Sequence, residues 1–290
     1  MGATGLIGRR LVAALTRRGD EAVAVSRRGA AVDGAESVRW NPAEGPPPAA
    51  ALEGVDAVVN LAGAPIAGGR WTRARKRAIR ASRVETTRLL VDALGPGGPG
   101  TLVNASAVGY YGPRDDTVEE SAPPGDDFLA RTAVAWEGEA LRARERGVRV
   151  ILLRSGIVLA REGGALPRLA LLTRLFLGGP LGGGRQWMPW IHIDDEVGLI
   201  LFALDHEQVA GPLNAAAPAP VRQRDLARAL GRVLHRPAVV PAPALAVRLA
   251  MGEMATVALD GQRAVPAAAL GAGYAFRFEE VEAALRELLG

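Results

Sequence analysis

Short apolar runs alternate with longer segments in which apolar residues recur every three or four positions over the first 155 residues. A short continuous run is typical of a strand buried on both faces, and the longer spacing is typical of an amphipathic helix. Strands are predicted over 21–26, 52–61, 101–106 and 148–154, and helices over 11–15, 72–94 and 126–146, with a glycine and proline break at 95–100. This alternation predicts an α/β fold, a doubly wound parallel sheet with crossover helices on both faces.

The pattern changes after residue 155. An apolar helix is predicted over 166–177, and the glycine-rich stretch 178–184 suits either a mobile flap or a plain linker. A further helix is predicted over 196–206, and the segment 213–216 could rejoin the sheet. Beyond Pro220, short helices are separated by prolines at 237, 241, 243 and 266. The tail beyond Pro220 is therefore predicted to be mostly helical.

Glycines occupy every third position of the opening segment, Gly2-Ala3-Thr4-Gly5-Leu6-Ile7-Gly8, directly before the first helix. A residue without Cβ lets the backbone approach a pyrophosphate, and the helix N-terminus adds free N–H groups and a positive dipole end. A glycine-rich turn is the alternative, because the chain has 36 glycines. The context of strands and helices favours an NAD(P)-binding Rossmann fold. The residues predicted to hold the pyrophosphate are Gly2, Thr4, Gly5, Leu6 and Ile7.

The strand that follows ends in Ser26, Arg27 and Arg28. NAD-binding folds place an acidic residue here, on the ribose diol, whereas arginine pairs with a 2′-phosphate through charge-assisted bonds. We therefore expect NADP(H), with Ser26, Arg27 and Arg28 around the 2′-phosphate, and a solvated charged turn is the alternative. Ala62, Gly63 and Arg83 are expected to flank the ribose and nicotinamide.

Residues 1–158 and 192–216 would form the NADP-binding domain, and residues 159–191 and 217–290 the substrate lobe. Apolar residues make up 49% of the chain, enough for a substantial core. There is no cysteine, which excludes a disulfide framework, a thiolate nucleophile and a cysteine-based metal site.

The isoelectric point is near 10.2 although the net charge is only +4, because nearly every base is an arginine. The densest basic cluster, residues 70–83, shares its segment with apolar residues at helical spacing, which predicts a helix with a basic outer face. Nucleic acid is therefore not the expected partner. With no apolar run long enough to span a membrane and no leader pattern, we expect a cytoplasmic protein.

Several blocks together resemble a known family: GATGLIGRRL, VVNLAG, SRVETTRLLVDAL, SAVGYYG and QWMPWIHIDD. They resemble the atypical extended short-chain dehydrogenases/reductases of the YfcH type, an epimerase-like family with a C-terminal domain of uncharacterised function. The resemblance covers essentially the whole chain. It implies a Rossmann domain that binds NADP(H) and a small, mostly helical substrate lobe. It also implies a small-molecule substrate such as a sugar nucleotide or carbonyl compound, and it is compatible with a homodimer.

Ordinary members of that superfamily use a serine and a Tyr-x-x-x-Lys pair, in which the tyrosine passes a proton to or from the substrate oxygen. Ser106 can be the serine. The pair is absent, because the only lysine, Lys76, precedes Ser106. Tyr110 or Tyr111, just past the strand 101–106, could act as the acid, or both rings pack the loop and line the pocket.

Two further motifs lie between the lobes. We expect His192 and Asp194 to bond to the backbone and Asp194 or Asp195 to cap the following helix, with an acid/base role as the alternative. No metal site is predicted, because the chain has only three histidines and no second one at ligand spacing. Trp187 and Trp190 either stack on a planar ligand or pack the core.

Two functions remain open from the sequence. The first is an NADP(H)-dependent oxidoreductase or epimerase-like enzyme, in which Ser106 orients the substrate oxygen and Tyr110 or Tyr111 donates the proton. The second is a catalytically silent NADP(H)-binding sensor or partner-binding module, as the missing Tyr-x-x-x-Lys pair suggests. A nucleic-acid binder is a third, weaker reading.

The glycine loop normally follows the central strand of the sheet, and only Met1 precedes it here. Without that strand two neighbours keep unpaired ladders, and each buried orphan amide costs about 1–3 kcal/mol. We expect translation to start about five to eight codons upstream, a typical strand length. Intact-mass measurement of native protein tests this, and a fully stable mature chain that begins at Met1 would contradict it.

Overall fold

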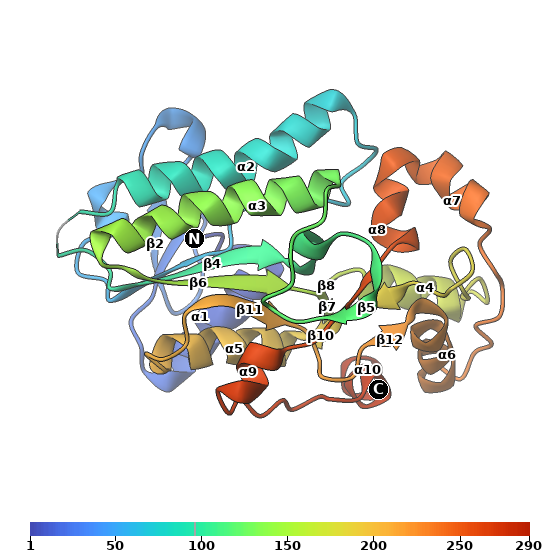
Figure 1. The fold of residues 1–290 in the computed structure, drawn as a ribbon. Helices are drawn as coiled ribbons and strands as arrows, with labels where there is room; N and C mark the ends of the chain where they lie inside the picture. The colour runs from blue at the N-terminus through green and yellow to red at the C-terminus, as the bar shows by residue number, and fades with distance from the viewer. Residues whose placement is uncertain (96) are drawn as a thin grey trace.

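Four parallel strands form the main sheet, with helices on both faces (Figure 1). The computed structural model describes residues 1–95 and 97–290, so Pro96 of the predicted break lies outside the described residues. The strand order is β11 (Gly211–Ala215), β6 (Arg149–Ser155), β4 (Thr101–Ala107) and β3 (Ala57–Asn60). Helices α2 (Arg73–Asp92) and α3 (Phe128–Leu141) cover one face, and α1 (Leu6–Arg18) and α5 (Ile193–Asp205) cover the other. The predicted α/β architecture is confirmed, including the return of residues 213–216 to the sheet.

A second pair of strands continues this layer on the far side of the glycine loop. Strand β1 (Val23–Ser26) pairs in parallel with β2 (Glu36–Arg39). Strand β2 was not predicted, because its sequence ESVR is polar and half exposed, as expected of an edge strand.

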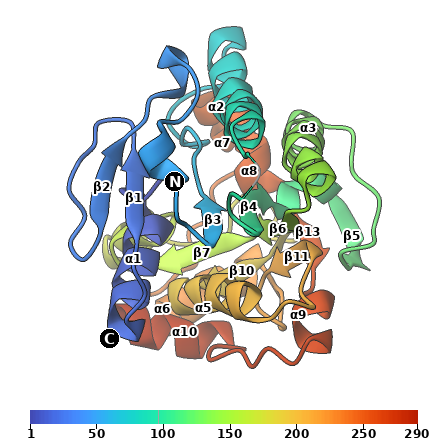
Figure 2. The same ribbon diagram turned by 90° about the vertical axis from the view of Figure 1, so that its left-hand side faces the viewer.

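The first residues of the chain lie between β1 and β3 (Figure 2). Gly2 N donates to Val25 O and Leu61 N donates to Met1 O, both at 3.0 Å. Both strands, together with α1, also line a cavity of about 770 Å³. The central position of the layer is thus bridged near the carboxyl ends of the strands and hollow over the rest.

Helices α2 and α3 begin within two residues of their predicted starts, and each has a side-chain cap. Thr72 accepts from Arg75 N at 3.1 Å at the start of α2, and Asp127 accepts from Ala130 N at 2.8 Å at the start of α3. The helix predicted over 126–146 changes after Leu141 to a 3₁₀ turn, which ends at Gly147 with φ of 77°.

A buried polar network fixes these helices on the sheet. The Thr87 hydroxyl, on α2, accepts from the Asn60 amide at 3.0 Å and from the Trp136 indole at 2.9 Å. The Asn60 amide also donates to Asn104 Oδ1 at 2.7 Å on the next strand. Thr87, Asn60 and Asn104 are fully buried. Water cannot replace a hydrogen bond that is lost here, so each polar group needs its partner within the protein.

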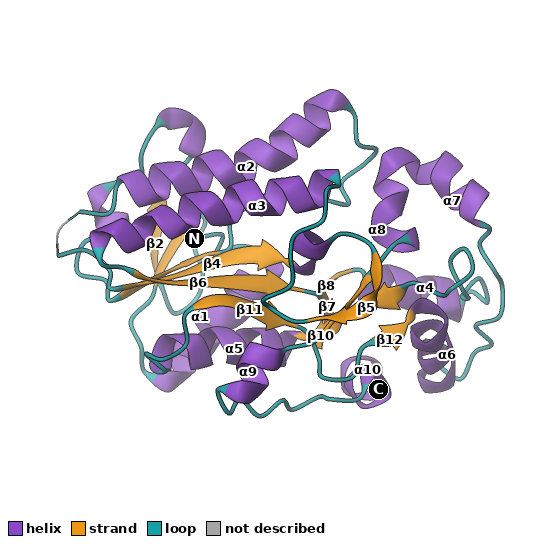
Figure 3. Ribbon diagram, viewed as in Figure 1, coloured by secondary structure: helices purple, strands orange, loops and turns teal. Residues whose placement is uncertain are grey.

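Short helices and strand pairs make up the rest of the chain (Figure 3). The helices are α4 (Leu166–Arg174), α6 (Gln223–Val233), α7 (Ala244–Met251), α8 (Thr256–Leu259), α9 (Ala267–Gly271) and α10 (Val281–Leu289). The strand pairs are β7 (Ile157–Ala160) with β8 (Gly163–Gly164) and β10 (Trp190–His192), β9 (Trp187–Met188) with β12 (Val221–Arg222), and β5 (Arg114–Val118) with β13 (Gln262–Ala264). The proline-separated helices are confirmed, and the division of the chain at 158, 192 and 216 stays a prediction. No helix within the described residues is long and apolar enough to cross a bilayer.

The network at Thr87 gives a stability prediction. Thr87→Val keeps the shape and removes an acceptor that serves two buried donors, so the free energy of unfolding should fall by about 1–3 kcal/mol. Urea denaturation measures the loss. Thr117→Val, at an exposed position on β5, is the control and should change stability by less than about 0.5 kcal/mol. Equal stability of the two variants would contradict the role of the network.

Candidate nucleotide and substrate site

The glycine loop makes close backbone contacts that no larger residue allows. A Cβ on Gly8 would lie 2.4 Å from Gly2 O, and one on Gly2, whose φ is 76°, would lie 2.9 Å from the Leu61 carbonyl carbon. The loop therefore turns tightly against the end of β3 and directs the chain into α1. Its N-cap, Gly5, has no side chain, so the first N–H groups of α1 are left for an anion.

A groove of about 270 Å³ runs over this helix start. Four of the residues predicted to hold the pyrophosphate, Gly2, Gly5, Leu6 and Ile7, line this groove, and Thr4 does not. Their role stays a prediction. Sequence reasoning missed the opposite wall, which consists of Ile157, Val158, Gly164 and Ala165.

Two arginines extend from the end of β1 beside the loop. The bond from Gly2 N to Val25 O places the loop next to this strand end. Arg27 and Arg28 are exposed, and neither makes an ion pair within the described part of the chain. Ser26 is buried, and its hydroxyl accepts from Ala30 N at 3.2 Å, which shapes the turn. Two guanidinium groups are thus available to a phosphate.

Ala62 and Gly63 follow β3 on the other side of the loop. Ala62 N donates to Asn60 Oδ1 at 3.3 Å, and a Cβ on Gly63 would lie 3.1 Å from the guanidinium carbon of Arg83. Arg83, on α2, donates to the carbonyls of Ala64 and Ile79, both at 3.1 Å. Burial lowers the pKa of Arg83 to about 10, and the charge of Arg75 adds to this. The three predicted residues therefore lie together.

A cavity of about 180 Å³ lies where β6 and α3 meet residues 187–189 and 256–262. Its walls are largely apolar, and its polar side chains include Arg83, Asp127, Ser155, Asp260 and Gln262. Parallel α/β sheets bind ligands beyond the carboxyl ends of their strands, and this cavity lies there. It is the candidate substrate pocket.

Ser106 does not line this cavity. Its hydroxyl is buried and donates to Glu137 Oε1 at 2.6 Å. Arg154 holds the same carboxylate with two bonds of 2.8 Å. Burial lowers the pKa of Arg154 and the Glu137 pair raises it, and the net direction is upward. The serine is thus one member of a closed ion-pair network.

The two tyrosines belong to the same network. The Tyr111 hydroxyl donates to Asn214 Oδ1 at 2.7 Å and accepts from Arg154 at 2.9 Å. Burial raises the pKa of Tyr111, and the neighbouring Arg154 only partly opposes this. The Tyr110 ring lies 3.5 Å from the guanidinium carbon of Arg154. Tyr110 and Tyr111 are not among the described residues that line the cavity.

Helix α3 presents other side chains to the cavity. Its lining residues are Leu129, Thr132, Ala133 and Trp136. Positions 132 and 136 have the i, i+4 spacing of a Tyr-x-x-x-Lys pair, but carry a threonine bonded to its own helix and a tryptophan bonded to Thr87. This helix face therefore supplies no phenol and no ammonium group.

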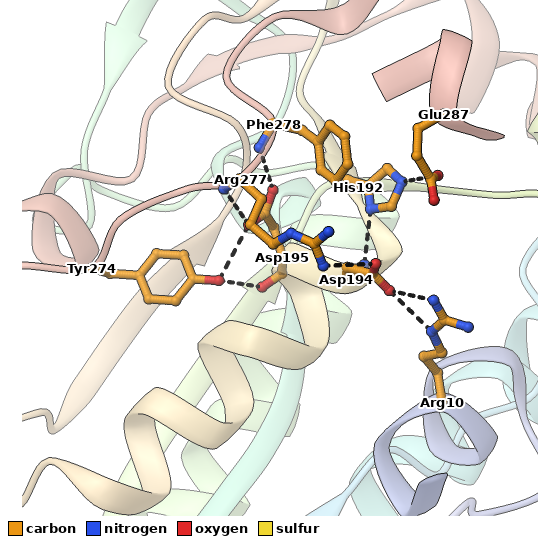
Figure 4. Close-up of polar contacts among 8 residues, drawn as sticks. All are labelled: Arg10, His192, Asp194, Asp195, Tyr274, Arg277, Phe278 and Glu287. Atoms are coloured by element: carbon orange, nitrogen blue, oxygen red, sulfur yellow. Dashed lines mark hydrogen bonds and ion pairs between the residues drawn. The ribbon is translucent and has the colours of Figure 1, made fainter. Parts of the chain in front are cut away.

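His192, and not an aspartate, caps α5 (Figure 4). Its ring is fully buried, Nδ1 accepts from Asp194 N at 3.0 Å, and Nε2 lies 3.0 Å from Glu287 Oε2. The predicted backbone bond of His192 is confirmed. The predicted aspartate cap was wrong, because the imidazole reaches the free N–H first.

Both aspartates instead tie distant segments to α5 (Figure 4). Asp194 pairs with Arg10 at 2.7 Å and Arg277 at 3.2 Å, so its predicted backbone bonding was also wrong. Asp195 is buried and accepts from the backbone N–H groups of Arg277 and Phe278 at 2.8 and 3.0 Å. This cluster joins α1, α5 and the C-terminal segment, and its residues do not line the substrate cavity.

The tryptophans and the glycine stretch also have defined places. Trp190 is fully buried and donates to Ala219 O at 3.1 Å, so it packs the core. Trp187 lines the cavity, with the guanidinium carbons of Arg222 and Arg263 at 3.8 and 4.7 Å from its ring centroid. Residues 178–184 bond to residues 240–242, for example through Gly182 N and Ala242 O at 2.7 Å.

Glu137 and Asn214 are residues of the site that sequence reasoning missed. Glu137 lies four residues after Ala133 and seven after Ala130, on the buried face of α3. An acidic residue at an apolar helical position indicates a buried partner, and this signal was available in the sequence.

Comparison with known proteins identifies the family. Residues 1–216 match the model of the NAD dependent epimerase/dehydratase family, and residues 242–288 match a domain of unknown function, DUF1731. The chain belongs to the NAD dependent epimerase/dehydratase family. Epimerase family protein ML0860 of Mycobacterium leprae is 43% identical over 286 residues, which cover 98% of this chain and 92% of that protein.

A solved structure resembles this epimerase-family protein over nearly its whole length. The crystal structure of human epimerase family protein SDR39U1 (isoform 2) with NADPH has a TM-score of 0.89 at 37% identity, covering 99% of this chain and 97% of that one. These matches confirm the predicted family and the NAD(P)-binding α/β fold. The cofactor in the human structure is the one that the sequence predicts for this chain.

The buried ion pair gives a second stability prediction. Glu137→Ala leaves the Arg154 charge buried without a partner, which should cost about 3–5 kcal/mol of unfolding free energy. Glu139→Ala, on the same helix, removes a more exposed pair with Arg142 and should cost less than about 1 kcal/mol. Thermal or urea unfolding compares the two, and similar losses would contradict the assignment.

Proposed function

We propose that this protein is an NADP(H)-dependent oxidoreductase that acts on a small carbonyl or carbinol compound. The observation that carries the proposal is that the glycine loop, the two arginines after β1 and the cavity all lie at the carboxyl ends of the parallel strands. The cap-free start of α1 and the arginines after β1 suit the phosphates of a dinucleotide. The cavity beyond β6 lies on the side where the strands end.

The residues fit the cofactor on three counts. The Cβ-free loop lets a pyrophosphate approach the N–H groups of α1, as Gly2, Gly5 and Gly8 allow. Arg27 and Arg28 have no ion pair within the described residues and suit a 2′-phosphate. Arg83, beside Gly63, would flank the nicotinamide. Bound there, the dinucleotide supplies or accepts a hydride.

The cavity limits the substrate. A volume of about 180 Å³ is below the 300–1,000 Å³ typical of drug-sized ligand pockets. Its largely apolar walls favour a small carbonyl compound over a whole sugar nucleotide. In this proposal Ser106 and Tyr111 have a structural role, because their hydroxyls are bonded to Glu137 and Asn214.

A silent NADP(H)-binding module is the second candidate, and one observation favours it. The cavity-facing side chains of α3 include neither a tyrosine nor a lysine. Turnover of NADPH with a panel of aldehydes, ketones and sugar nucleotides separates the two functions. Tight NADPH binding without turnover, unchanged in Ser106→Ala, would favour the silent module.

The arginines give the direct test of the cofactor. The double variant Arg27→Ala, Arg28→Ala should weaken NADPH binding at least about tenfold and leave NADH binding unchanged, because charge-assisted bonds to the 2′-phosphate are lost. Fluorescence titration of each nucleotide measures both constants. Arg17→Ala, at an exposed position late in α1, is the control. An unchanged NADPH/NADH preference in the double variant would refute the phosphate assignment.

A further inference from the structure

Glu196 is a carboxyl group that the proposed function leaves unused. It lies in the first turn of α5 and is fully buried. Its Oε2 atom has no hydrogen-bond partner among the described residues. Its Oε1 atom lies 2.5 Å from the hydroxyl of Ser155. An acidic side chain is rarely buried with so few partners, since desolvation of the charge is costly.

Ser155 connects this carboxyl to the substrate cavity. It is the last residue of β6 and lines the cavity beside Gly156 and Ile157. The backbone here is fixed, because Gly156 N donates to Ala215 O at 2.9 Å and a Cβ on Gly156 would lie 2.4 Å from Pro189 O. The hydroxyl is therefore held between the buried carboxyl and the cavity.

We infer that Ser155 and Glu196 form a proton relay for an oxygen atom bound in the cavity, which makes the ligand a carbonyl or carbinol compound. This inference rests on the proposed function and names the group that handles the proton. Ser155 contacts the ligand oxygen, and Glu196 acts through Ser155 as a positioning residue that holds the proton.

The relay balances in atoms and charge. When a hydride reaches the carbonyl carbon, the oxygen gains the electron pair of the broken π bond. The Ser155 O–H proton then bonds to that oxygen, and the Glu196 carboxyl proton moves to Ser155 Oγ. Glu196 keeps the electron pair as a carboxylate, and it regains a proton through Ser155 when the product leaves. The reverse order serves oxidation of a carbinol.

The electrostatic surroundings suit this role. Burial raises the pKa of Glu196 to about 7, and the Ser155 hydrogen bond partly opposes this. A group poised near neutral pH can both give and take a proton. The other ionisable groups of this region have partners of their own. Asp195 accepts from the backbone of residues 277 and 278, and Tyr274 donates to Asp195. Arg10 pairs with Asp194, and Arg154 pairs with Glu137.

Infrared difference spectra between pH 5.5 and 8.5 test the first half of the relay. The wild type should lose the C=O band of a protonated carboxyl with a midpoint near pH 7, and Glu196→Gln should lack this band. In Ser155→Ala the midpoint should rise, because a donor to the carboxylate is gone. Glu207→Gln, exposed just beyond α5, is the matched control and should keep the band. Absence of a titrating band over this range in the wild type, as an ordinary pKa of 4.5 would give, or persistence of the band in Glu196→Gln, would overturn the inference.

Binding of benzaldehyde to the NADP⁺ complex, where no hydride is available, tests the second half. When an aldehyde oxygen accepts the Ser155 hydrogen bond, the Glu196 carboxylate loses its donor and the pKa of Glu196 rises. A rise of about one unit at pH 7 corresponds to an uptake of about 0.4 proton per protein. Calorimetry in two buffers of different ionisation enthalpy measures this uptake. Glu196→Gln should bind the aldehyde within about threefold and show no uptake.

Each remaining outcome is decisive. Equal proton uptake in wild type and Glu196→Gln, or no saturable aldehyde binding, would overturn the relay. NADPH affinity, titrated separately, reports on the proposed function. Failure of NADPH binding would sink that function even if the Glu196 carboxyl titrates as expected, so the two failures are distinguishable.

Discussion

A guanidinium group in a protein interior must be neutralised where it lies, and the site of this protein is organised around that requirement. Arg154 is 2% exposed at the carboxyl end of β6, and Glu137 reaches it from α3 with a bidentate pair. The same two groups bond Ser106 and Tyr111. One ion pair thus fixes the end of two strands, the loop after β4 and one helix. The superfamily's reactive serine position becomes a structural member of this network.

The nucleotide groove depends on a different constraint, the close approach of two backbone segments. Gly2 and Gly8 have no space for a Cβ, so the loop can turn against β3 and present the uncapped start of α1. The same segment bridges β1 and β3 over a cavity of about 770 Å³. The first residues of the chain thus line the proposed nucleotide groove and also bridge the sheet, which links the proposed phosphate recognition to the continuity of the sheet.

The surroundings of the cavity offer a route for proton transfer that does not use a Tyr-x-x-x-Lys pair. Among the side chains with which α3 lines the cavity, Thr132 and Trp136 are bonded within the protein, and none is a phenol or an ammonium group. The ionisable group with a pKa near neutrality lies instead on α5, on the other face of the sheet, and reaches the cavity through Ser155. A general acid can therefore come from a different helix, because proton transfer requires only a donor within hydrogen-bond reach of the reacting oxygen.

The sequence by itself determined the alternation of strands and helices, the approximate extents of α2 and α3, the glycine loop and the two arginines after β1. These features follow from local rules of periodicity, backbone freedom and charge, which act within a few residues. Only the tertiary structure decided which side chains meet: Ser106 with Glu137 across 31 positions, and Ser155 with Glu196 across 41. Such pairs depend on strand register and on how helices lie across the sheet. A short-range pattern carries no record of either, and for that reason these two pairs appeared only in the folded chain.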